Sequence, residues 1–396
     1  MSHTTHAHSH LSPGVLGHGQ IPFSEPGTPG SHPSTIGFIG VGNIGAAIAK
    51  NLAVYSATHK ADTHSFVIYN RTKAKAEKLV SEVEERLAAN GGILSIKVAD
   101  TVDEVVEQSD IIIASTNCDE SSISLAKQIA ELVKTAKPRI RIIVETSTLY
   151  PTTAGEIDSI LTADHNTHFI AAPVFGAPQA AKEAKLILCL AGDYASKKKI
   201  AYLLVPAAAR KCIDLGGNVE KAAAFKLLGN SFIVGTLELL AETHTFAEKI
   251  GVGSQAFHDL LGGTSATVRY CMSTKANEPL ITDLFPAPPV AGYSKRILTD
   301  DFDASNGFQI DGGLKDVHHM QRLASEHQVP IPIIDIAQQH LVTAKALNAS
   351  QPSYKVIQNQ DWSSLVAASR VAAGLSPFDS SSHRTGPVLE PEPEEE

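Results

Sequence analysis

A glycine pattern near residue 40 constrains the fold more than any other feature of the sequence. The segment TIGFIGVGNIGAAIAKNL, Thr35 to Leu52, is a short apolar run, then three glycines spaced G-x-G-x-x-G, then residues at helical spacing. Gly40 permits a tight turn, Gly42 lets a pyrophosphate approach the backbone, and Gly45 lets the helix pack closely on the strand. The pattern predicts a strand–turn–helix unit that binds a dinucleotide at the N-terminus of its helix.

Strands and helices alternate after this unit. Stretches with helical spacing, such as KAKAEKLVSEVEERLAAN and SSISLAKQIAELVKTA, separate several apolar runs. Apolar strands that alternate with helices are typical of a parallel sheet with both faces covered. We expect strands at 35–42, 65–70, 93–99, 110–116, 140–147 and 168–174, with two more at 185–192 and 211–216 that extend the sheet.

The pattern changes after Gly217. The run VEKAAAFKLLGNSFIVGTLELLAETHTFAEKIG carries no strand signal. As one helix of about thirty residues it would be about 45 Å long, enough to leave one domain and enter another. The predicted fold class is therefore α/β, with a Rossmann-type, doubly wound, mostly parallel sheet at 35–217. An all-helical domain at 218–375, which includes the long connecting helix, follows it.

Both ends of the chain have the composition of tails. Residues 1–34 are rich in His, Ser, Gly and Pro, and residues 376–396 end in an acidic run. Such segments bury too little apolar surface to fold, so we expect both to be disordered. The histidines of the first tail could bind a metal adventitiously, but an unstructured polar tail is the favoured interpretation.

Charge and composition narrow the possible partners and compartment. The net charge is −9 and no basic patch stands out, so we expect no nucleic-acid partner. No apolar run reads as a membrane span, and the first twenty or so residues lack the basic and apolar segments of a signal peptide. Four cysteines without C-x-x-C spacing indicate reduced thiols. We therefore expect a cytoplasmic protein without membrane contact.

The end of the second expected strand bears on which dinucleotide binds. An Asp or Glu there takes the ribose hydroxyls of NAD, but this chain has Asn70, followed by Arg71 and Thr72. An acid would repel a 2′-phosphate, whereas a guanidinium forks onto it. The sequence predicts NADP(H) over NAD(H), with an Arg that is merely exposed after a strand as the alternative.

Four separated segments form a recognisable set of motifs: IGFIGVGNIGAAIAKNL, ETSTLYP, AAPVFGAPQAA and FKLLGN, with a weaker fifth at GGLKDVHHMQRLA. They resemble the motifs of the β-hydroxyacid dehydrogenase family, which includes 3-hydroxyisobutyrate dehydrogenase and the NADP-binding domain of 6-phosphogluconate dehydrogenase. The resemblance runs from about residue 35 to about residue 348. With the glycine turn and the end of the second strand, it implies cofactor contacts from Gly40, Gly42, Asn43, Ile44, Gly45, Asn70, Arg71, Thr72, Thr116, Asn117, Thr148 and Lys315.

The same resemblance implies a substrate side. Ser147 and the backbone around Gly176 and Ala177 would bind the carboxylate of a small-molecule substrate. The family loop usually reads APVSGG, and here Phe175 and Ala177 stand in place of its serine and second glycine. These two departures leave a larger or more apolar substrate open.

Lys226 and Asn230, in FKLLGN, resemble the catalytic K-x-x-x-N of the family. Residues four apart share a helix face. The resemblance implies that Lys226 is the general acid/base. A lysine in water has a pKa of about 10.4, and desolvation in an apolar cleft would lower that pKa toward the range useful for proton exchange. Lys226 would take the hydroxyl proton while a hydride leaves the carbinol carbon, and Asn230 would hold the hydroxyl or the lysine.

Two other functions stay open. An imine reductase or reductive aminase shares this architecture, although those relatives usually lack the lysine. A non-catalytic dinucleotide-binding module is the second alternative, and the retained Lys226 and Asn230 argue against it.

Two further expectations concern metals and assembly. His318 and His319 are adjacent, so on a helix they point about 100° apart, and no carboxylate partner is evident, so we predict no metal site. The apolar long helix and the family resemblance indicate a homodimer or a higher homo-oligomer.

Overall fold

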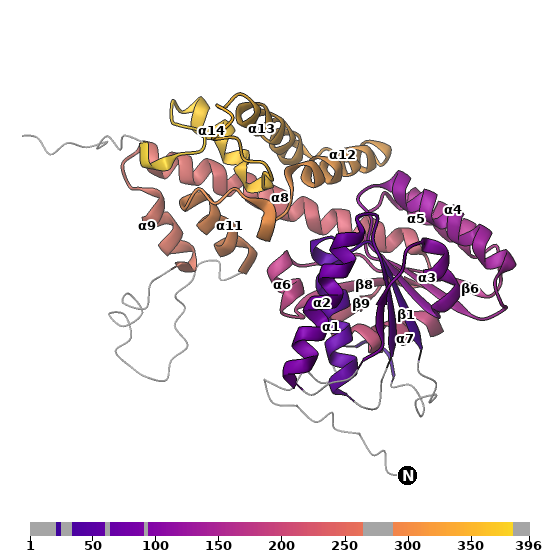
Figure 1. Ribbon diagram of the computed structural model, residues 1–396. Coiled ribbons are helices and arrows are strands. Elements are labelled where there is room, and N and C mark those ends of the chain that lie inside the picture. The colour runs from indigo at the N-terminus through magenta and orange to yellow at the C-terminus, as the bar shows by residue number, and fades with distance from the viewer. Residues whose placement is uncertain (1–20, 25–33, 60–63, 91–93, 264–287, 383–396) are drawn as a thin grey trace, which may run out of the picture. The chain divides into compact units, whose positions relative to one another are not determined.

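The computed structural model describes residues 21–24, 34–59, 64–90, 94–263 and 288–382 (Figure 1). Its contacts divide the chain into two compact units, Met1–Lys226 and Leu227–Glu396, which are described separately below. The division falls inside the long helix α8 (Val219–Lys249), so the first turns of that helix belong to the first unit.

The first unit is built on a nine-stranded sheet in the order β3-β2-β1-β4-β5-β6-β8-β7, with β9 paired to β8. Strands β1 to β6 run parallel, β8 is antiparallel to β6 and β7, and β9 is parallel to β8. The expected mostly parallel, Rossmann-type sheet is thereby confirmed. The strands are β1 Thr35–Ile39, β2 Ser65–Tyr69, β3 Ile96–Val98, β4 Ile111–Ala114, β5 Arg141–Glu145, β6 Thr167–Ala171, β7 Val174–Phe175, β8 Leu186–Gly192 and β9 Ala209–Asp214.

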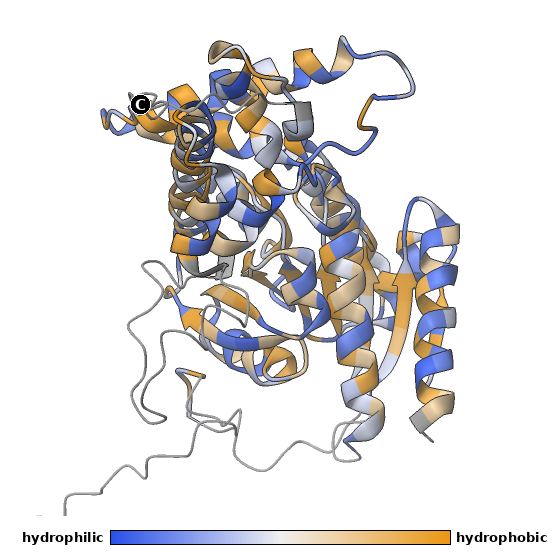
Figure 2. Ribbon diagram, turned by 90° about the vertical axis from the view of Figure 1, so that its left-hand side faces the viewer, coloured by the Kyte–Doolittle hydropathy of each residue, from blue (hydrophilic) through white to orange (hydrophobic). Residues whose placement is uncertain are grey.

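Both faces of this sheet are covered because successive strand residues are buried on opposite sides. On β1, Phe38 belongs to one apolar core and Ile39 to the other. Figure 2 shows the strands in the colours of apolar residues. The first core also takes in α1 Asn43–Thr58, α2 Lys73–Asn90, α6 Pro178–Lys182 and α7 Tyr194–Leu204. The second core takes in α3 Val102–Gln108, α4 Asp119–Thr135, α5 Pro151–Leu161 and the start of α8.

A short N-terminal segment packs on the first unit. Ile21 and Phe23 are buried, and the Tyr202 hydroxyl of α7 donates to the Phe23 carbonyl at 2.9 Å. The Lys198 ammonium donates to Ser24 Oγ at 3.1 Å. Residues 21–24 therefore differ from the expected disordered tail, because two apolar side chains there find partners on α7. The rest of that tail before residue 34 lies outside the described residues.

The described part of the second unit is helical, as predicted, with two isolated antiparallel bridges, Asp303 to Gln360 and Gln309 to Asp361. After α8, the described elements of the second unit are α9 Ser254–His258, a π-helix at Asp259–Gly263, α11 Pro288–Leu298, α12 Ile310–Glu326, α13 Pro332–Ala349, α14 Val366–Ala372 and short 3₁₀ turns at Ala304–Asn306, Trp362–Leu365 and Ser380–Ser382.

Residues 377–380 also differ from the expected tail, since Ser380 N–H donates to Asp300 at 2.8 Å and Phe378 packs edge-on to Phe302.

Helix α8 corrects one expectation from the sequence. It is long and apolar enough to cross a membrane by length and composition alone, whereas the sequence was expected to contain no such run. The core helix of a soluble protein can be equally long and apolar. Ala222 lies in the core of the first unit, and Val234 and Leu237 of the second unit are fully buried, so protein covers part of this helix.

Candidate functional site

The glycine turn connects β1 to α1 and leaves room for a ligand at one position. Gly40 has φ +92°, and a Cβ there would lie 2.1 Å from the Ser115 carbonyl oxygen. A Cβ on Gly45 would lie 2.5 Å from the Gly40 carbonyl oxygen. A Cβ on Gly42 would meet nothing within 4 Å. Gly40 and Gly45 are therefore required by the fold, whereas Gly42 faces open space.

The first turn of α1 fits a phosphate group. Gly42 is the N-cap of this helix, and no side chain caps its first turn. N–H groups at the start of an uncapped helix attract anions, and the helix dipole adds to that attraction. The described residues at this turn, Asn43 and Ile44 among them, thus fit the pyrophosphate of a dinucleotide.

Asn70 ties the end of β2 to this turn. Its Oδ1 accepts a hydrogen bond from Val41 N–H at 3.0 Å, and its Nδ2 donates to the Thr72 carbonyl at 3.0 Å. Arg71 and Thr72 are exposed beside it. The structure thus gives Asn70 a positioning role that the sequence did not reveal, and it leaves the two neighbouring polar side chains accessible.

Ser147 joins the loops that follow β4 and β5. Its Oγ accepts from Thr116 N–H at 2.6 Å and donates to the Thr116 carbonyl at 3.1 Å. Beneath it, the Glu145 carboxyl accepts from Ser147 N–H at 3.0 Å, and burial raises the pKa of Glu145. Thr148 is half-buried in the same loop, and Asn117, next to Thr116, is exposed. Ser147, expected to bind substrate, is thus also part of the scaffold.

The loop around Gly176 meets α8. Gly176 is exposed with φ +143°, and Ala177, also exposed, is the N-cap of α6. Just before them, the Phe175 ring lies under the Lys226 ammonium, with 4.4 Å from Nζ to the ring centroid. The structure therefore brings the predicted substrate loop and the predicted acid/base group together within the first unit.

A buried carboxylate organises the predicted residues of the second unit. Asn230 Nδ2 on α8 donates to Asp316 Oδ2 on α12 at 2.7 Å, and Lys315 Nζ lies 3.2 Å from Asp316 Oδ1. Asp316 is completely buried. Sequence reasoning matched Asp316 to a family motif but gave it no role. Only the fold shows that it holds Asn230, because the two residues lie 86 positions apart.

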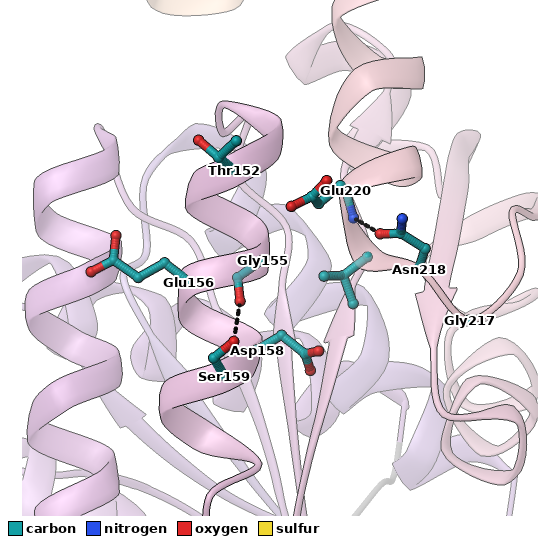
Figure 3. A pocket seen from close by; sticks show the side chains of 9 residues that line it. Thr152, Gly155, Glu156, Asp158, Ser159, Gly217, Asn218 and Glu220 are labelled. Carbon is teal, nitrogen blue, oxygen red and sulfur yellow. Dashed lines mark hydrogen bonds between the residues drawn. The ribbon is translucent and has the colours of Figure 1, made fainter.

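A hollow of about 480 Å³ lies elsewhere in the first unit, between α5 and the start of α8 (Figure 3). Carboxylates line it, from Glu156, Asp158 and Glu220, and burial raises the pKa of Asp158. On the α8 side of the hollow, Glu220 N–H donates to Asn218 Oδ1 at 2.9 Å. None of the predicted site residues lines this hollow. Its negative charge disfavours both a pyrophosphate and a substrate carboxylate.

Candidate metal ligands do not gather in the part of the chain that the structure describes. No three His, Cys, Asp or Glu side chains there are placed to hold an ion. His318 is exposed on α12, and His319 beside it is half-buried.

Comparison with known proteins adds a family to this geometry. Residues 35–217 match the family model described as the NAD binding domain of 6-phosphogluconate dehydrogenase. Residues 221–357 match the model described as NAD-binding of NADP-dependent 3-hydroxyisobutyrate dehydrogenase. The two matched ranges correspond to the sheet domain and to most of the helical part.

Curated proteins and solved structures agree with these matches. The chain is 29% identical over 300 residues to the NADH-dependent oxidoreductase ucdB of Aspergillus ustus, covering 75% of this chain and 88% of that protein. It is 28% identical over 310 residues to the uncharacterized oxidoreductase YfjR of Bacillus subtilis, covering 77% and 92%. The solved structure of a Mycobacterium tuberculosis 3-hydroxyisobutyrate dehydrogenase with L-serine has a TM-score of 0.61 at 21% identity, covers 86% of this chain and 100% of that one, and shows the shared fold.

The sheet domain with its glycine turn and the helical region after it are each matched by a family model. The two family models adjoin and together span nearly all of the described chain after residue 34. The chain belongs to the β-hydroxyacid dehydrogenase family, and it is an NAD(P)-dependent oxidoreductase.

Proposed function

We propose that the protein interconverts a small β-hydroxy acid and its semialdehyde or oxo acid, with NADP(H) as cofactor and Lys226 as general acid/base. The observation that carries the proposal is the position of the Lys226 ammonium, 4.4 Å from the ring centroid of Phe175 in the loop that leads to Gly176. The bound nicotinamide supplies the hydride acceptor or donor. The chain supplies a proton-exchanging amine next to a loop with exposed backbone.

Each named group has one task in this proposal. Lys226 Nζ takes the substrate hydroxyl proton during oxidation and returns it during reduction. The backbone at Gly176 and Ala177 binds the substrate carboxylate together with the Ser147 hydroxyl. Asn230, one turn along α8, holds the hydroxyl or the amine without adding charge, and its amide is oriented by Asp316.

The decisive experiment measures turnover by the purified full-length protein of a panel of carboxylate-bearing aldehydes, oxo acids and cyclic imines, each with NADPH and with NADH. We expect reduction of a carboxylate-bearing aldehyde that Lys226→Ala lowers by 10²-fold or more, as is typical when a general acid/base is lost. Full turnover by that variant would refute the role of the lysine. Reduction of imines alone would favour the imine reductase alternative, and NADPH binding without any turnover would favour the non-catalytic module.

The preference for NADP(H) rests on the end of β2. No carboxylate is present among residues 69–72 to bind the ribose hydroxyls of NAD. The exposed Arg71 can instead form paired hydrogen bonds to a 2′-phosphate. The relative from Aspergillus ustus is named for NADH, so the ratio of kcat/KM with the two cofactors has to be measured on this protein. A higher kcat/KM with NADH would refute the preference.

We also propose that the protein forms a homodimer or a higher homo-oligomer through α8. Phe232, Leu239 and Phe246 are exposed by 77%, 63% and 63% and recur every seven residues, and Leu228, one turn before Phe232, is 64% exposed. A patch of this kind on one helix face suits self-association, since a twofold interface uses one surface twice. Light scattering on wild type and Phe232→Asp tests this. A monomeric wild type would refute it.

The remaining expectations complete the proposal. The ligand is a small carboxylate-bearing molecule, and the protein works in the cytoplasm without nucleic-acid or membrane partners. The net charge of −9 disfavours binding to nucleic acid or to anionic lipid. Cell fractionation that found the protein bound to membranes would contradict this part.

A further inference from the structure

Phe175 occupies a defined place on one face of the sheet. In the antiparallel pair β7–β8 it lies opposite Ile187, and Ile187 lies opposite Lys211 on β9. Residues directly opposite each other point to the same face, as do residues two apart on one strand. Phe175, Lys211 and Cys189 of β8 therefore share the sheet face that the Lys226 amine approaches.

Two contacts fix the ring relative to the amine. Lys226 Nζ lies 4.4 Å from the Phe175 ring centroid. The ring also forms a T-shaped pair with Phe225, with centroids 6.0 Å apart and planes at 81°. The ring is held by a strand at its backbone and by this packing on Phe225, whereas the lysine side chain has four rotatable bonds. The ring thus selects one of the many positions the ammonium could take.

The electrostatics of this contact favour the charged lysine. The face of an aromatic ring is negative and attracts an ammonium within about 6 Å, and it offers no such attraction to a neutral amine. The Cys189 thiol interacts electrostatically with both Lys226 and Lys211, and burial raises the pKa of this thiol to about 11, so it carries no charge near neutral pH. The Phe175 ring therefore adds a contribution that favours the protonated amine.

We propose that Phe175 is a positioning residue for Lys226: its ring face seats the ammonium beside the substrate loop, at the position where the family loop has a serine hydroxyl. The catalytic consequence rests on the proposed function, since it assumes that Lys226 exchanges the substrate proton. The position and protonation of the amine do not depend on that assumption and can be measured without a substrate.

The test compares three full-length variants with wild type. Phe175→Leu keeps apolar bulk and removes the ring, Phe175→Tyr keeps the ring, and Phe225→Leu removes the ring that packs on Phe175 but leaves the ring under the amine. Lysines are reductively methylated with ¹³C-formaldehyde, and the signal of Lys226 is assigned by its loss in Lys226→Arg. The titration midpoint of that signal is then followed by NMR, and circular dichroism checks that each variant is folded.

We expect Phe175→Leu to lower the midpoint by about half a pH unit, and Phe175→Tyr and Phe225→Leu to leave it close to wild type. A Phe175→Leu midpoint equal to wild type would overturn the proposal, as would an equal shift in Phe225→Leu. If Phe175→Leu does not fold, a shift in Phe175→Tyr comparable to half a unit would overturn it, and an unchanged midpoint there supports it.

Activity separates this proposal from the proposed function. Where a carboxylate-bearing aldehyde is turned over, the same shift appears in the pH profile of kcat, with KM changed less, and Phe175→Tyr restores the profile. The protein could turn over no such aldehyde while Phe175→Leu still shifts the titration midpoint of Lys226. That result would refute the proposed function alone and would support the positioning of the amine by Phe175.

Discussion

Asp316 and Asn230 form a buried hydrogen bond of 2.7 Å between α12 and α8, and it orients the amide of a residue in the proposed catalytic pair. Because Nδ2 donates to the carboxylate, the amide oxygen of Asn230 is turned away from that carboxylate. The direction of the Asn230 side chain is therefore set by a carboxylate on a different helix.

Removing this carboxylate is expected to affect both stability and turnover. Asp316→Ala would remove the carboxylate that accepts a hydrogen bond from the buried Asn230 amide, at a cost of about 1–3 kcal/mol in the free energy of unfolding. We expect kcat to fall more than KM changes. Urea denaturation and steady-state kinetics measure the two effects. Gln321→Ala, which removes half-exposed hydrogen bonds from the same helix to α13, is the control and should alter stability by less than about 0.5 kcal/mol.

An ion pair in the second unit makes stability depend on pH. His340 Nδ1 on α13 lies 2.6 Å from Glu238 Oε1 on α8, and the hydrogen bond to Glu238 raises the pKa of His340. A raised pKa in the folded state means that the contribution is complete below about pH 6.5, the ordinary value for His, and is lost as the pH rises through the folded value.

We expect the difference in free energy of unfolding between wild type and His340→Gln to become smaller as the pH rises. His340→Gln should reduce the free energy of unfolding more at pH 6 than at pH 9, as measured by denaturant titration at both pH values. The control is His318→Gln, which removes an exposed histidine of α12 that takes no part in this ion pair. A gap between His340→Gln and wild type that stays constant from pH 6 to 9 would contradict the assignment.

Replacing glycine with alanine is expected to have different effects at two positions of the turn after β1: a loss of stability at one and a loss of NADPH affinity at the other. Gly40→Ala puts a Cβ 2.1 Å from the Ser115 carbonyl oxygen at φ +92°, so we expect a loss of stability of at least about 1–3 kcal/mol. Gly42→Ala meets no atom within 4 Å, so its melting temperature should match wild type while NADPH binds more weakly. Thermal melts with and without NADPH distinguish the two. Normal NADPH affinity in Gly42→Ala would argue against dinucleotide binding at the turn between β1 and α1.

Asn70 offers a substitution that changes charge at constant shape. Asn70→Asp keeps the oxygen that accepts from Val41 N–H and adds a negative charge next to Arg71. We expect the ratio of kcat/KM for NADPH over NADH to fall about tenfold or more, since hydrogen bonds to charged groups contribute about 1.5–3 kcal/mol. Arg71→Ala should lower the ratio in the same direction. An unchanged ratio in both variants would place the cofactor preference elsewhere.

Local patterns were sufficient to predict the sheet domain and the long helix. The glycine turn, the apolar strands and the absence of strand signal after Gly217 each depend on neighbours in sequence, and all three appear in the structure as expected. Residues 21–24 were missed because Phe23 and Ser24 bond to Tyr202 and Lys198 of α7, which lie far along the chain. The composition of residues 1–34 cannot indicate a contact with a helix so distant in the sequence.

In the candidate site, too, local motifs could be predicted from the sequence and long-range contacts could not. Lys226 and the Gly176 loop could be named from motifs, but the roles of Asp316 and Asn70 could not, since each depends on one long-range hydrogen bond. Phe175 was visible only as a departure from a family pattern. Its contact with Lys226 follows from the pairing of β7 with β8 and from the position of α8, and neither of these is written in the local sequence.

The double hydrogen bond between Ser147 and Thr116 has a kinetic consequence. The two bonds tie the loop after β4 to the loop after β5. On the proposed roles, a dinucleotide that orders Thr116 also orders Ser147, and a substrate that binds at Ser147 then loses less entropy. Such coupling is reciprocal in binding free energy, so we expect the dinucleotide and the substrate each to raise the affinity for the other by the same factor.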